Sequence, residues 1–267
     1  MTKASLPVVS PTLKIFIPKF RRLATQATLG LSVLLSALAS AAAPTPAPTL
    51  PTLVQATYKI YKAGILLGKV EERFERDRDR YKITSATRAD GPFSALIREE
   101  ISYQSEGKIG PDGLVPLVFS STRKSDISKS FTSRFNWESN QLIREHEERN
   151  AGGRMETETF DLPTRAQDRL SAMYQFMVSI PTEQRLETLM TQGKHTDKYH
   201  YLRQGDSDVT TPAGQFPTVH YVRQTKSGES KAELWLAKDR NYLAVRVVFT
   251  DTKGTSLEQR LVDLVIR

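Results

Sequence analysis

The chain contains no cysteine, and this absence removes several kinds of chemistry at once. No disulfide can form, no thiolate can ligate a metal, and no cysteine can act as a nucleophile. The lipid-bearing cysteine of a bacterial lipoprotein signal is also missing, so we do not expect the mature protein to be a lipoprotein. The lack of cysteine does not by itself decide the compartment.

Motifs of catalysis are scarce as well. The sequence has no Gly-x-Ser-x-Gly motif and no glycine-rich phosphate-binding loop. A glycosidase would need two facing carboxylates, which the sequence alone does not pair. We therefore predict no catalytic residue and no cofactor, and we leave open whether the protein is an enzyme.

Histidine is rare too, and a metal site needs several ligands that converge on one point. The four histidines are His146, His195, His200 and His220. The densest group is His195 with Asp197 and His200, but on a strand His195 and His200 would face opposite sides because their separation is odd. We predict solvated hairpin residues here and no metal site.

An excess of positive charge is present in the whole chain but is nearly lost outside its first 43 residues. The formal net charge is +8, from 38 basic and 30 acidic residues. Five of the basic residues and none of the acidic ones lie in residues 1–43, so the rest carries 33 basic against 30 acidic residues. Its charges alternate in sign, as in residues 71–80, whereas phosphate recognition needs a basic face of one sign. We predict no nucleic-acid binding.

The N-terminus has the three parts of a secretory signal. Basic residues from Lys14 to Arg22 precede an apolar stretch at about 23–38, and small residues around Ala39 and Ala41 follow it. We expect export to a Gram-negative periplasm with cleavage near Ala41. The alternative is an uncleaved leader that anchors the chain in the inner membrane, because the stretch is nearly long enough to span a bilayer.

The predicted organisation has three parts. Residues 1–41 form the signal peptide, residues 42–52 form a proline-rich linker, and residues 53–267 form a single β-rich domain. Four prolines lie between Pro44 and Pro51, so this segment should be extended, without a fold of its own.

Apolar and polar residues alternate from Leu53 onward, which is the period of a β-strand. The same spacing predicts one shared face for Leu257, Gln259, Leu261, Asp263 and Val265. Turn sequences separate such runs at 77–79, 110–113, 150–153, 211–214, 226–228 and 252–254. We count roughly a dozen strands and predict an all-β fold, mainly an antiparallel rolled sheet or a barrel-like fold.

One segment, at about 165–179, has the period of a helix. Thr164 and Gln167 match a capping box, and Pro181 is suited to end the helix. The helical spacing places four residues on one face: Leu170, Met173, Tyr174 and Met177. This face could line a ligand cavity or could be ordinary core packing.

Two charged residues lie at the start of this helix. Asp168 suits the helix dipole, and Arg169 could bind an anionic ligand if its side chain points inward. The alternative for Arg169 is a buried ion pair or a cap contact that fixes the helix to the sheet. We take Arg169, together with the four apolar residues of the helix, as the candidate ligand site.

Acidic residues gather on both sides of the turn predicted at 150–153. They are Glu145, Glu147, Glu148, Glu156, Glu158 and Asp161. No calcium-binding loop motif is present, and arginines lie nearby. We predict ion pairs between neighbouring strands on a solvent-exposed face.

The order of several short motifs resembles one family of secreted bacterial proteins. These motifs are Tyr58…Gly64-Ile65…Gly68, Gly107…Gly110-Pro111-Asp112-Gly113-Leu114-Val115-Pro116, Ala166-Gln167-Asp168-Arg169-Leu170-Ser171, Thr211-Pro212-Ala213-Gly214-Gln215-Phe216, Trp235-Leu236-Ala237 and Arg246. Together they resemble the domain-of-unknown-function 3108 family over roughly 53–267. The resemblance implies an exported β-rich protein and supplies no activity.

From these features we expect a non-enzymatic binding or carrier protein for an apolar or amphipathic ligand of the cell envelope, such as a lipid. A curled sheet of a dozen strands can enclose more space than its own side chains fill. The alternatives are a hydrolase acting on envelope material and a scaffold or assembly partner. In each case we expect association with the membrane to be peripheral at most.

Overall fold

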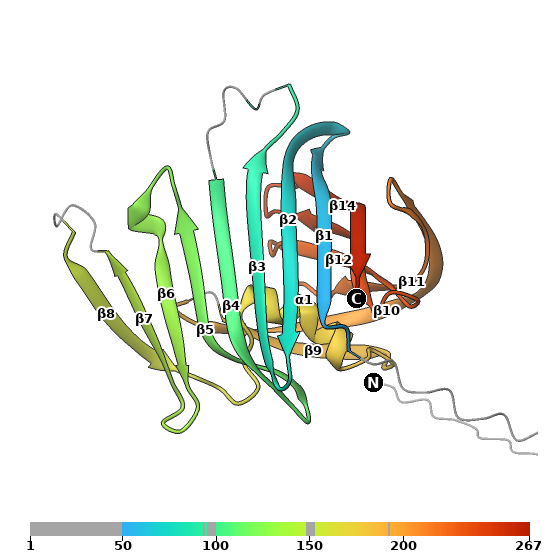
Figure 1. Ribbon diagram of the computed structural model, residues 1–267. Coiled ribbons are helices and arrows are strands. Elements are labelled where there is room, and N and C mark those ends of the chain that lie inside the picture. The colour runs from blue at the N-terminus through green and yellow to red at the C-terminus, as the bar shows by residue number, and fades with distance from the viewer. Residues whose placement is uncertain (1–49, 93, 95–99, 148–152, 192) are drawn as a thin grey trace, which may run out of the picture. The chain divides into compact units, whose positions relative to one another are not determined.

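The computed structural model describes residues 50–92, 94, 100–147, 153–191 and 193–267. They belong to one compact unit, Pro46–Arg267. The predicted signal peptide at 1–41 and residues 42–49 of the predicted linker lie outside the described residues. What is described is an antiparallel sheet of 14 strands with one α-helix (Figure 1).

The strands form two consecutive meanders separated by the helix. The first meander comprises β1 (Leu53–Lys62), β2 (Ile65–Asp77), β3 (Arg80–Ala89), β4 (Glu100–Gly110), β5 (Gly113–Arg123), β6 (Phe131–Asn136), β7 (Gln141–Glu147) and β8 (Met155–Asp161), with a short 3-10 turn at Ile127–Lys129. Helix α1 (Arg169–Val178) follows. The second meander comprises β9 (Arg185–Thr191), β10 (Thr196–Thr211), β11 (Gly214–Arg223), β12 (Lys231–Ala237), β13 (Leu243–Thr250) and β14 (Ser256–Ile266).

The two meanders join in the middle of the sheet and end at its two edges. The spatial order runs from β8 through β1 to β14 and on to β9. The pair of β1 and β14 joins the beginning and the end of the domain, and Arg267 exchanges backbone hydrogen bonds with Leu53 there. The edge strands β8 and β9 have no ladder of hydrogen bonds between them, so the sheet is not closed.

The sheet curls around α1. The helix packs against β3, β4 and β5 on one side and against β9 and β13 on the other, which places it inside the curl (Figure 1). We call this curled sheet with its enclosed helix the roll. The predicted fold class, a mainly antiparallel rolled sheet with one principal helix, is confirmed.

Alternation along the strands decides which side chains face the interior. Val54, Ala56 and Tyr58 of β1 are buried, and Phe74 of β2 and Ile83 of β3 lie in the same core. Residues between them, such as Gln55, Arg73 and Lys82, point outward and are polar or charged. Five of the six predicted turn sequences lie where one strand ends and the next begins. The sixth, at 150–153, lies outside the described residues except for Gly153.

One predicted face of β14 is wrong because of a register shift. Leu261 is opposite Tyr58, but Asp263 is opposite Thr57, so one residue of β14 is left over between them. An extra residue of this kind turns the rest of the strand over. Leu261 is therefore buried, whereas Asp263 is exposed and its neighbours Leu264 and Ile266 pack on the core instead.

The helix begins four residues later than the spacing predicts. Asp168, not Thr164, is the N-cap, and its carboxylate accepts hydrogen bonds from the backbone N–H groups of Leu170 and Ser171 at 2.8 and 2.9 Å. The reason is that the backbone of Gln167 is already used. It donates to Leu189 and accepts from Thr191, which adds this segment to the edge of β9. The predicted end is confirmed to within one residue.

Candidate binding site

The five predicted ligand residues divide between the core and the surface. Leu170, Tyr174 and Met177 are buried in the main hydrophobic cluster, and Met173 is half-buried and contacts both clusters of the core. Arg169 is exposed, so the predicted buried ion pair is wrong. Arg169 does join the helix to the sheet, but through an aromatic ring on β4, as described below.

Tyr174 connects α1 to β2 in two ways. Its ring stacks on Phe74 with the centroids 5.5 Å apart, and its hydroxyl donates to Glu72 at 3.1 Å. The hydroxyl of Ser85 also donates to Glu72, at 3.3 Å. Burial raises the pKa of Glu72, and these two hydrogen bonds partly oppose that rise. The alternation of β2 places Glu72 among inward residues, but nothing in the sequence marks it as enclosed.

Asp168 is a second inward-facing carboxyl group, and it is fully buried. Beyond capping the helix, it accepts a 2.6 Å hydrogen bond from Ser105 on β4, whose hydroxyl also contacts that of Tyr81 on β3 at 3.2 Å. Burial raises the pKa of Asp168, and the bond from Ser105 opposes this. Asp168 and Glu72 thus fasten the helix to the sheet, and each oxygen of the two carboxyl groups accepts a hydrogen bond from the helix or from a strand.

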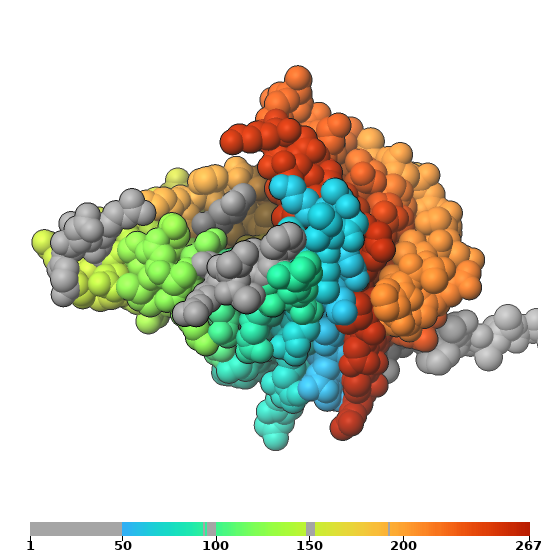
Figure 2. Space-filling model, turned by 90° about the horizontal axis from the view of Figure 1, so that it is seen from above, coloured from blue at the N-terminus to red at the C-terminus, as the bar shows by residue number. Residues whose placement is uncertain are grey.

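Near one end of the roll, the inner face is reached by solvent. Tyr103, Phe131 and His146 lie in one row across β4, β6 and β7; all three face inward, yet all are partly exposed. In the next row, Phe119 and Ser133 are buried. We call the first row the mouth. Figure 2, a view from above, shows a recess here between the green-to-lime surface of the first meander and the yellow-to-orange surface of β9 and β10.

Aromatic rings line this part of the inner face. Phe119 stands 6.0 Å from Tyr103 and 6.0 Å from Phe131, measured between ring centroids. A guanidinium covers each end of the series. Arg169 lies 4.4 Å above the ring of Tyr103 and donates to its hydroxyl at 2.8 Å, and Arg144 lies 4.7 Å above the ring of Phe131.

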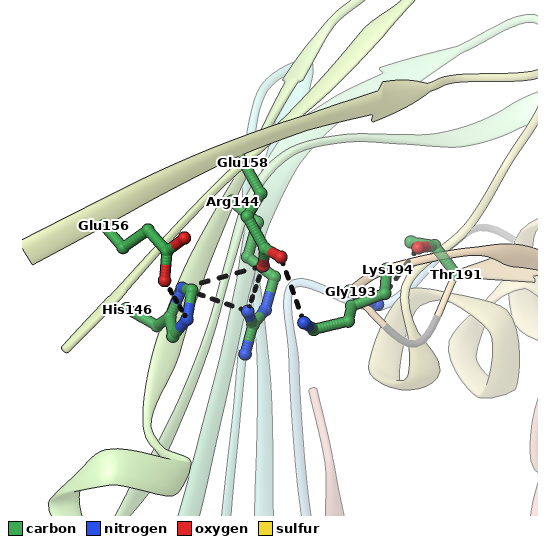
Figure 3. A network of polar contacts seen from close by, with 7 residues as sticks. All are labelled: Arg144, His146, Glu156, Glu158, Thr191, Gly193 and Lys194. Atoms are coloured by element: carbon green, nitrogen blue, oxygen red, sulfur yellow. Dashed lines mark hydrogen bonds and ion pairs between the residues drawn. The ribbon is translucent and has the colours of Figure 1, made fainter. Parts of the chain in front are cut away.

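Charged side chains from both edges of the sheet meet at Glu158 (Figure 3). Arg144 on β7 donates to Glu158 on β8 at 2.6 Å, and Lys194, in the turn between β9 and β10, donates to the other oxygen of Glu158 at 3.0 Å. His146 lies 3.0 Å from Arg144 and 3.4 Å from Glu156. The hydrogen bonds from Lys194 and Arg144 lower the pKa of Glu158. We call the contact of this turn with β6, β7 and β8 the seam.

The predicted ion pairs of the acidic segment therefore exist, but their setting differs from the prediction. Arg134 pairs with Glu145, and Arg144 pairs with Glu158. Only the first of these pairs is on an open face. Arg144 points inward, and its side chain is 10% exposed, because it follows the alternation of Leu142 rather than its own polarity. The sequence does not indicate which of the nearby arginines is enclosed by the folded sheet.

At the seam, the turn packs directly on the inner face. Gly193 has a φ of +95°, and a Cβ at this position would come within 2.9 Å of the Phe131 ring and 3.4 Å of Arg144 Nε. Within the described part of the chain, Arg144 Nε and the Ser133 hydroxyl beside it have no hydrogen-bond partner. A buried donor without a partner costs about 1–3 kcal/mol. The closed seam is therefore an imperfect contact.

The remaining histidines do not converge. His195 pairs with Asp197 at 3.2 Å, while His200 lies 3.5 Å from Glu187. In the described ranges, no three histidine or acidic side chains stand where they could hold one metal ion. No helix formed by the described residues is long and apolar enough to cross a membrane.

A groove of about 530 Å³ lies on the outer face of the sheet. Short outward side chains of two neighbouring rows line it, among them Thr57, Thr84, Ser102 and Ser120. A second groove of about 510 Å³ lies between the β10–β11 turn and β14. Neither groove is lined by any of the five predicted ligand residues, which face the interior or the mouth instead.

Comparisons with known proteins identify a family and one solved structure of similar fold. The model of the family described as "Protein of unknown function (DUF3108)" matches residues 57–262. A β-barrel-like protein of domain of unknown function DUF1849 from Brucella abortus has 13% identity and a TM-score of 0.51, over 81% of this chain and 98% of that one. A candidate lipoprotein of Parabacteroides distasonis has 12% identity and a TM-score of 0.34, over 82% and 97% of the two chains. No curated protein sequence matches this chain.

Proposed function

Since the chain belongs to the DUF3108 family, whose function is not established, its role has to be argued from its own geometry, and we propose that it is a non-enzymatic binding or carrier protein. The ligand is an apolar or amphipathic molecule of the cell envelope, such as a lipid. Its apolar part lies inside the roll, between α1 and the aromatic inner face of the first meander.

The observation that carries this proposal is the unclosed sheet. Every pair of neighbouring strands from β8 to β9 along the sheet is joined by a ladder of hydrogen bonds, whereas the two edges meet through side chains and one glycine turn. Separating a few side chains costs far less than breaking a ladder of backbone hydrogen bonds. The seam is therefore the natural place for the interior to open.

The surfaces beside the seam suit an apolar chain. The mouth presents Tyr103 and Phe131, and Phe119 continues the aromatic surface inward. On α1, Met173 is half-buried where the two core clusters meet, and its flexible side chain adapts to different shapes. Binding sites for small molecules commonly combine such apolar walls with a few fixed polar groups.

An envelope hydrolase would require polar groups with shifted pKa values to converge in one cleft. The two carboxyl groups with raised pKa values, on Glu72 and Asp168, lie under the helix and accept hydrogen bonds from Tyr174 and Ser105. Their positions are those of groups that hold the helix in place. This favours binding over catalysis.

Native mass spectrometry of the protein purified from a periplasmic extract without detergent tests the proposal. We expect a co-purifying mass of lipid size, which solvent extraction releases for identification. A protein that carries no such mass, and that also fails to take up an added fluorescent fatty acid after delipidation, would refute the carrier role.

A further inference from the structure

We propose that the polar end of the ligand is a singly charged anion, a carboxylate or a phosphodiester, which binds at the seam between Arg144, Ser133 and Lys194. This inference rests on the proposed function and adds the chemical class of the ligand and the residues that select it. The apolar chain would extend from this point along the aromatic rings of the mouth.

The first support is the pair of unpartnered polar groups. Ser133 is 1% exposed and its hydroxyl has no partner. Arg144, whose side chain is 10% exposed, has no partner for its Nε, as far as the described residues extend. The two residues are directly opposite each other in the row that runs from β5 to β8. An oxygen of an anion accepts hydrogen bonds from both a guanidinium and a hydroxyl, so one head group could satisfy both.

The second support is the local charge. Arg144 and Lys194 share one carboxylate, that of Glu158, so the three together carry one positive charge in excess. Glu156 is opposite His146 and lies farther out, and its side chain is 52% exposed. At the other end of the aromatic series Arg169 adds a further cation over Tyr103. A singly charged anion balances the Arg144–Glu158–Lys194 group.

The third support is the arrangement of charge against apolar surface. The Arg144 guanidinium lies over the ring of Phe131, and Phe119 follows at 6.0 Å, so a cation and an apolar surface are in direct contact. An amphipathic molecule has the same arrangement, with a charged end joined to an apolar chain. A free inorganic anion would use only one half of this surface.

Access to the site requires a small movement. Gly193 covers Arg144 Nε, and Lys194 is 56% exposed and held by a single ion pair. If the turn lifts, Lys194 Nζ can leave Glu158 and follow the anion. The turn then contributes one of the three groups that bind the head group, instead of excluding it.

The test compares two fluorescent probes on the delipidated protein, dansyl-undecanoic acid and its uncharged methyl ester. The readout is the ratio of their dissociation constants, because a change in access affects both probes alike. We expect the acid to bind more tightly than the ester. Lys194→Gln should reduce that preference roughly tenfold, since one charge-assisted hydrogen bond is lost. Ser133→Ala should reduce it by a smaller factor.

Lys198→Gln is the matched control, because Lys198 is also an exposed lysine in an ion pair, with Glu187, but lies on the hairpin away from the seam. Arg144→Gln is informative only if circular dichroism shows an unchanged fold. If the fold changes, Lys194→Gln alone decides whether the head-group site exists.

Equal binding of acid and ester, unaffected by Lys194→Gln, overturns the head-group site and leaves the carrier role intact. Displacement of the acid by acetate or inorganic phosphate alone overturns the amphipathic ligand. Failure of both probes to bind overturns the proposed function itself.

Discussion

At the scale of single residues, the described domain uses buried polar side chains to fix its helix. Asp168 caps α1 and accepts from Ser105, so one carboxyl group sets both where the helix starts and which strand it faces. Glu72 accepts a hydrogen bond from the hydroxyl of Tyr174, which lies in the second turn of the helix. Enclosed charges are costly unless they are hydrogen-bonded, and each oxygen of the two carboxyl groups accepts at least one hydrogen bond.

The pH dependence of Asp168 can be predicted in sign. Its folded-state pKa is raised above the ordinary 3.8, so the folded protein holds this proton more tightly than the unfolded chain. Stability from this group is therefore fully present below 3.8 and is lost as the pH rises from there through the raised folded-state value. We expect Asp168→Asn, which can still cap the helix, to remove this loss, as measured by urea unfolding between about pH 4 and pH 7.

Asp168→Ala provides the contrast, because it removes the cap at every pH. It should lower the free energy of unfolding by about 1–3 kcal/mol. If the Asn variant kept the same pH slope as the natural protein, the slope would have to come from other groups, with Glu72 the first to examine through Glu72→Gln.

At the scale of elements, α1 fastens the turn between β4 and β5. The Gln175 side chain accepts from the Leu114 N–H at 2.7 Å and donates to the Asp112 carbonyl at 2.9 Å. Gly113 has a φ of +120°, and a Cβ there would collide with the Gln175 amide. The glycine of this turn is thus needed for its backbone conformation and also for the approach of the helix.

Removing this amide should measurably weaken the domain. Gln175→Ala leaves the N–H of the buried Leu114 without an acceptor, and we expect a loss of about 1–3 kcal/mol in the free energy of unfolding. Gln215→Ala is the matched control, because the Gln215 side chain is exposed and its one contact, with Asp208, is 3.5 Å long. Chemical denaturation of the two variants decides the point, and equal effects would contradict the role given to Gln175.

The turn at the seam offers a second test at this scale. Gly193 and Gly228 both have a positive φ, but only Gly193 faces a neighbour that a Cβ would strike. The backbone cost of Gly→Ala is shared, so the difference between the variants isolates the contact with Phe131. We expect Gly193→Ala to lift the turn. Hydrogen exchange over 185–203 should therefore be faster, and so should uptake of the methyl ester of dansyl-undecanoic acid. Gly228→Ala should leave both unchanged.

The same elements show how far the sequence could lead. Strand alternation and turn residues predict the antiparallel sheet, and the helical spacing predicts the end of the helix. The spacing does not give its start, because two capping patterns overlap and only the pairing of Gln167 with β9 excludes the first. Alternation does not give the face of Asp263, because a bulge depends on the partner strand β1. Both errors come from contacts between segments far apart in the chain.

The candidate site was less predictable for the same reason. The helix residues Leu170 to Met177 follow from local spacing, and the structure places them in the core without testing whether they contact a ligand. The group formed by Arg144, Glu158 and Lys194 joins β7, β8 and the β9–β10 turn, which meet only because the whole sheet curls. The charge of Arg144, which lies between Ile143 and Glu145, gives no indication that its side chain is enclosed by a turn from the other edge of the sheet.

At the scale of the whole molecule, the leader remains a prediction. Residues 1–43 carry basic residues, an apolar stretch and small residues in the order of a secretory signal. N-terminal sequencing of the mature protein should find a start just after Ala41 or Ala39 in a periplasmic fraction. A start at Met1 in the cytoplasm would contradict export, and an intact leader in the membrane fraction would support the anchored alternative.

The unclosed sheet leads to the last prediction, which concerns the roll as a unit. The chain has no cysteine, so two introduced thiols are the only ones in the protein that a thiol-specific linker can join. Lys194→Cys with Glu158→Cys, linked by a short bis-maleimide, would hold the two edges of the sheet together where the ion pair now does. We expect the linked protein to take up no dansyl ester within the time that the same unlinked variant needs to reach equilibrium. The uncharged ester is the right probe, because the variant has lost Lys194.

Linking Lys198→Cys to Glu187→Cys, a pair within one hairpin, should leave uptake unchanged, since it does not join the edges. Normal uptake by the protein linked across the seam would show that the ligand enters elsewhere, because a covalent bridge there prevents the two meanders from separating.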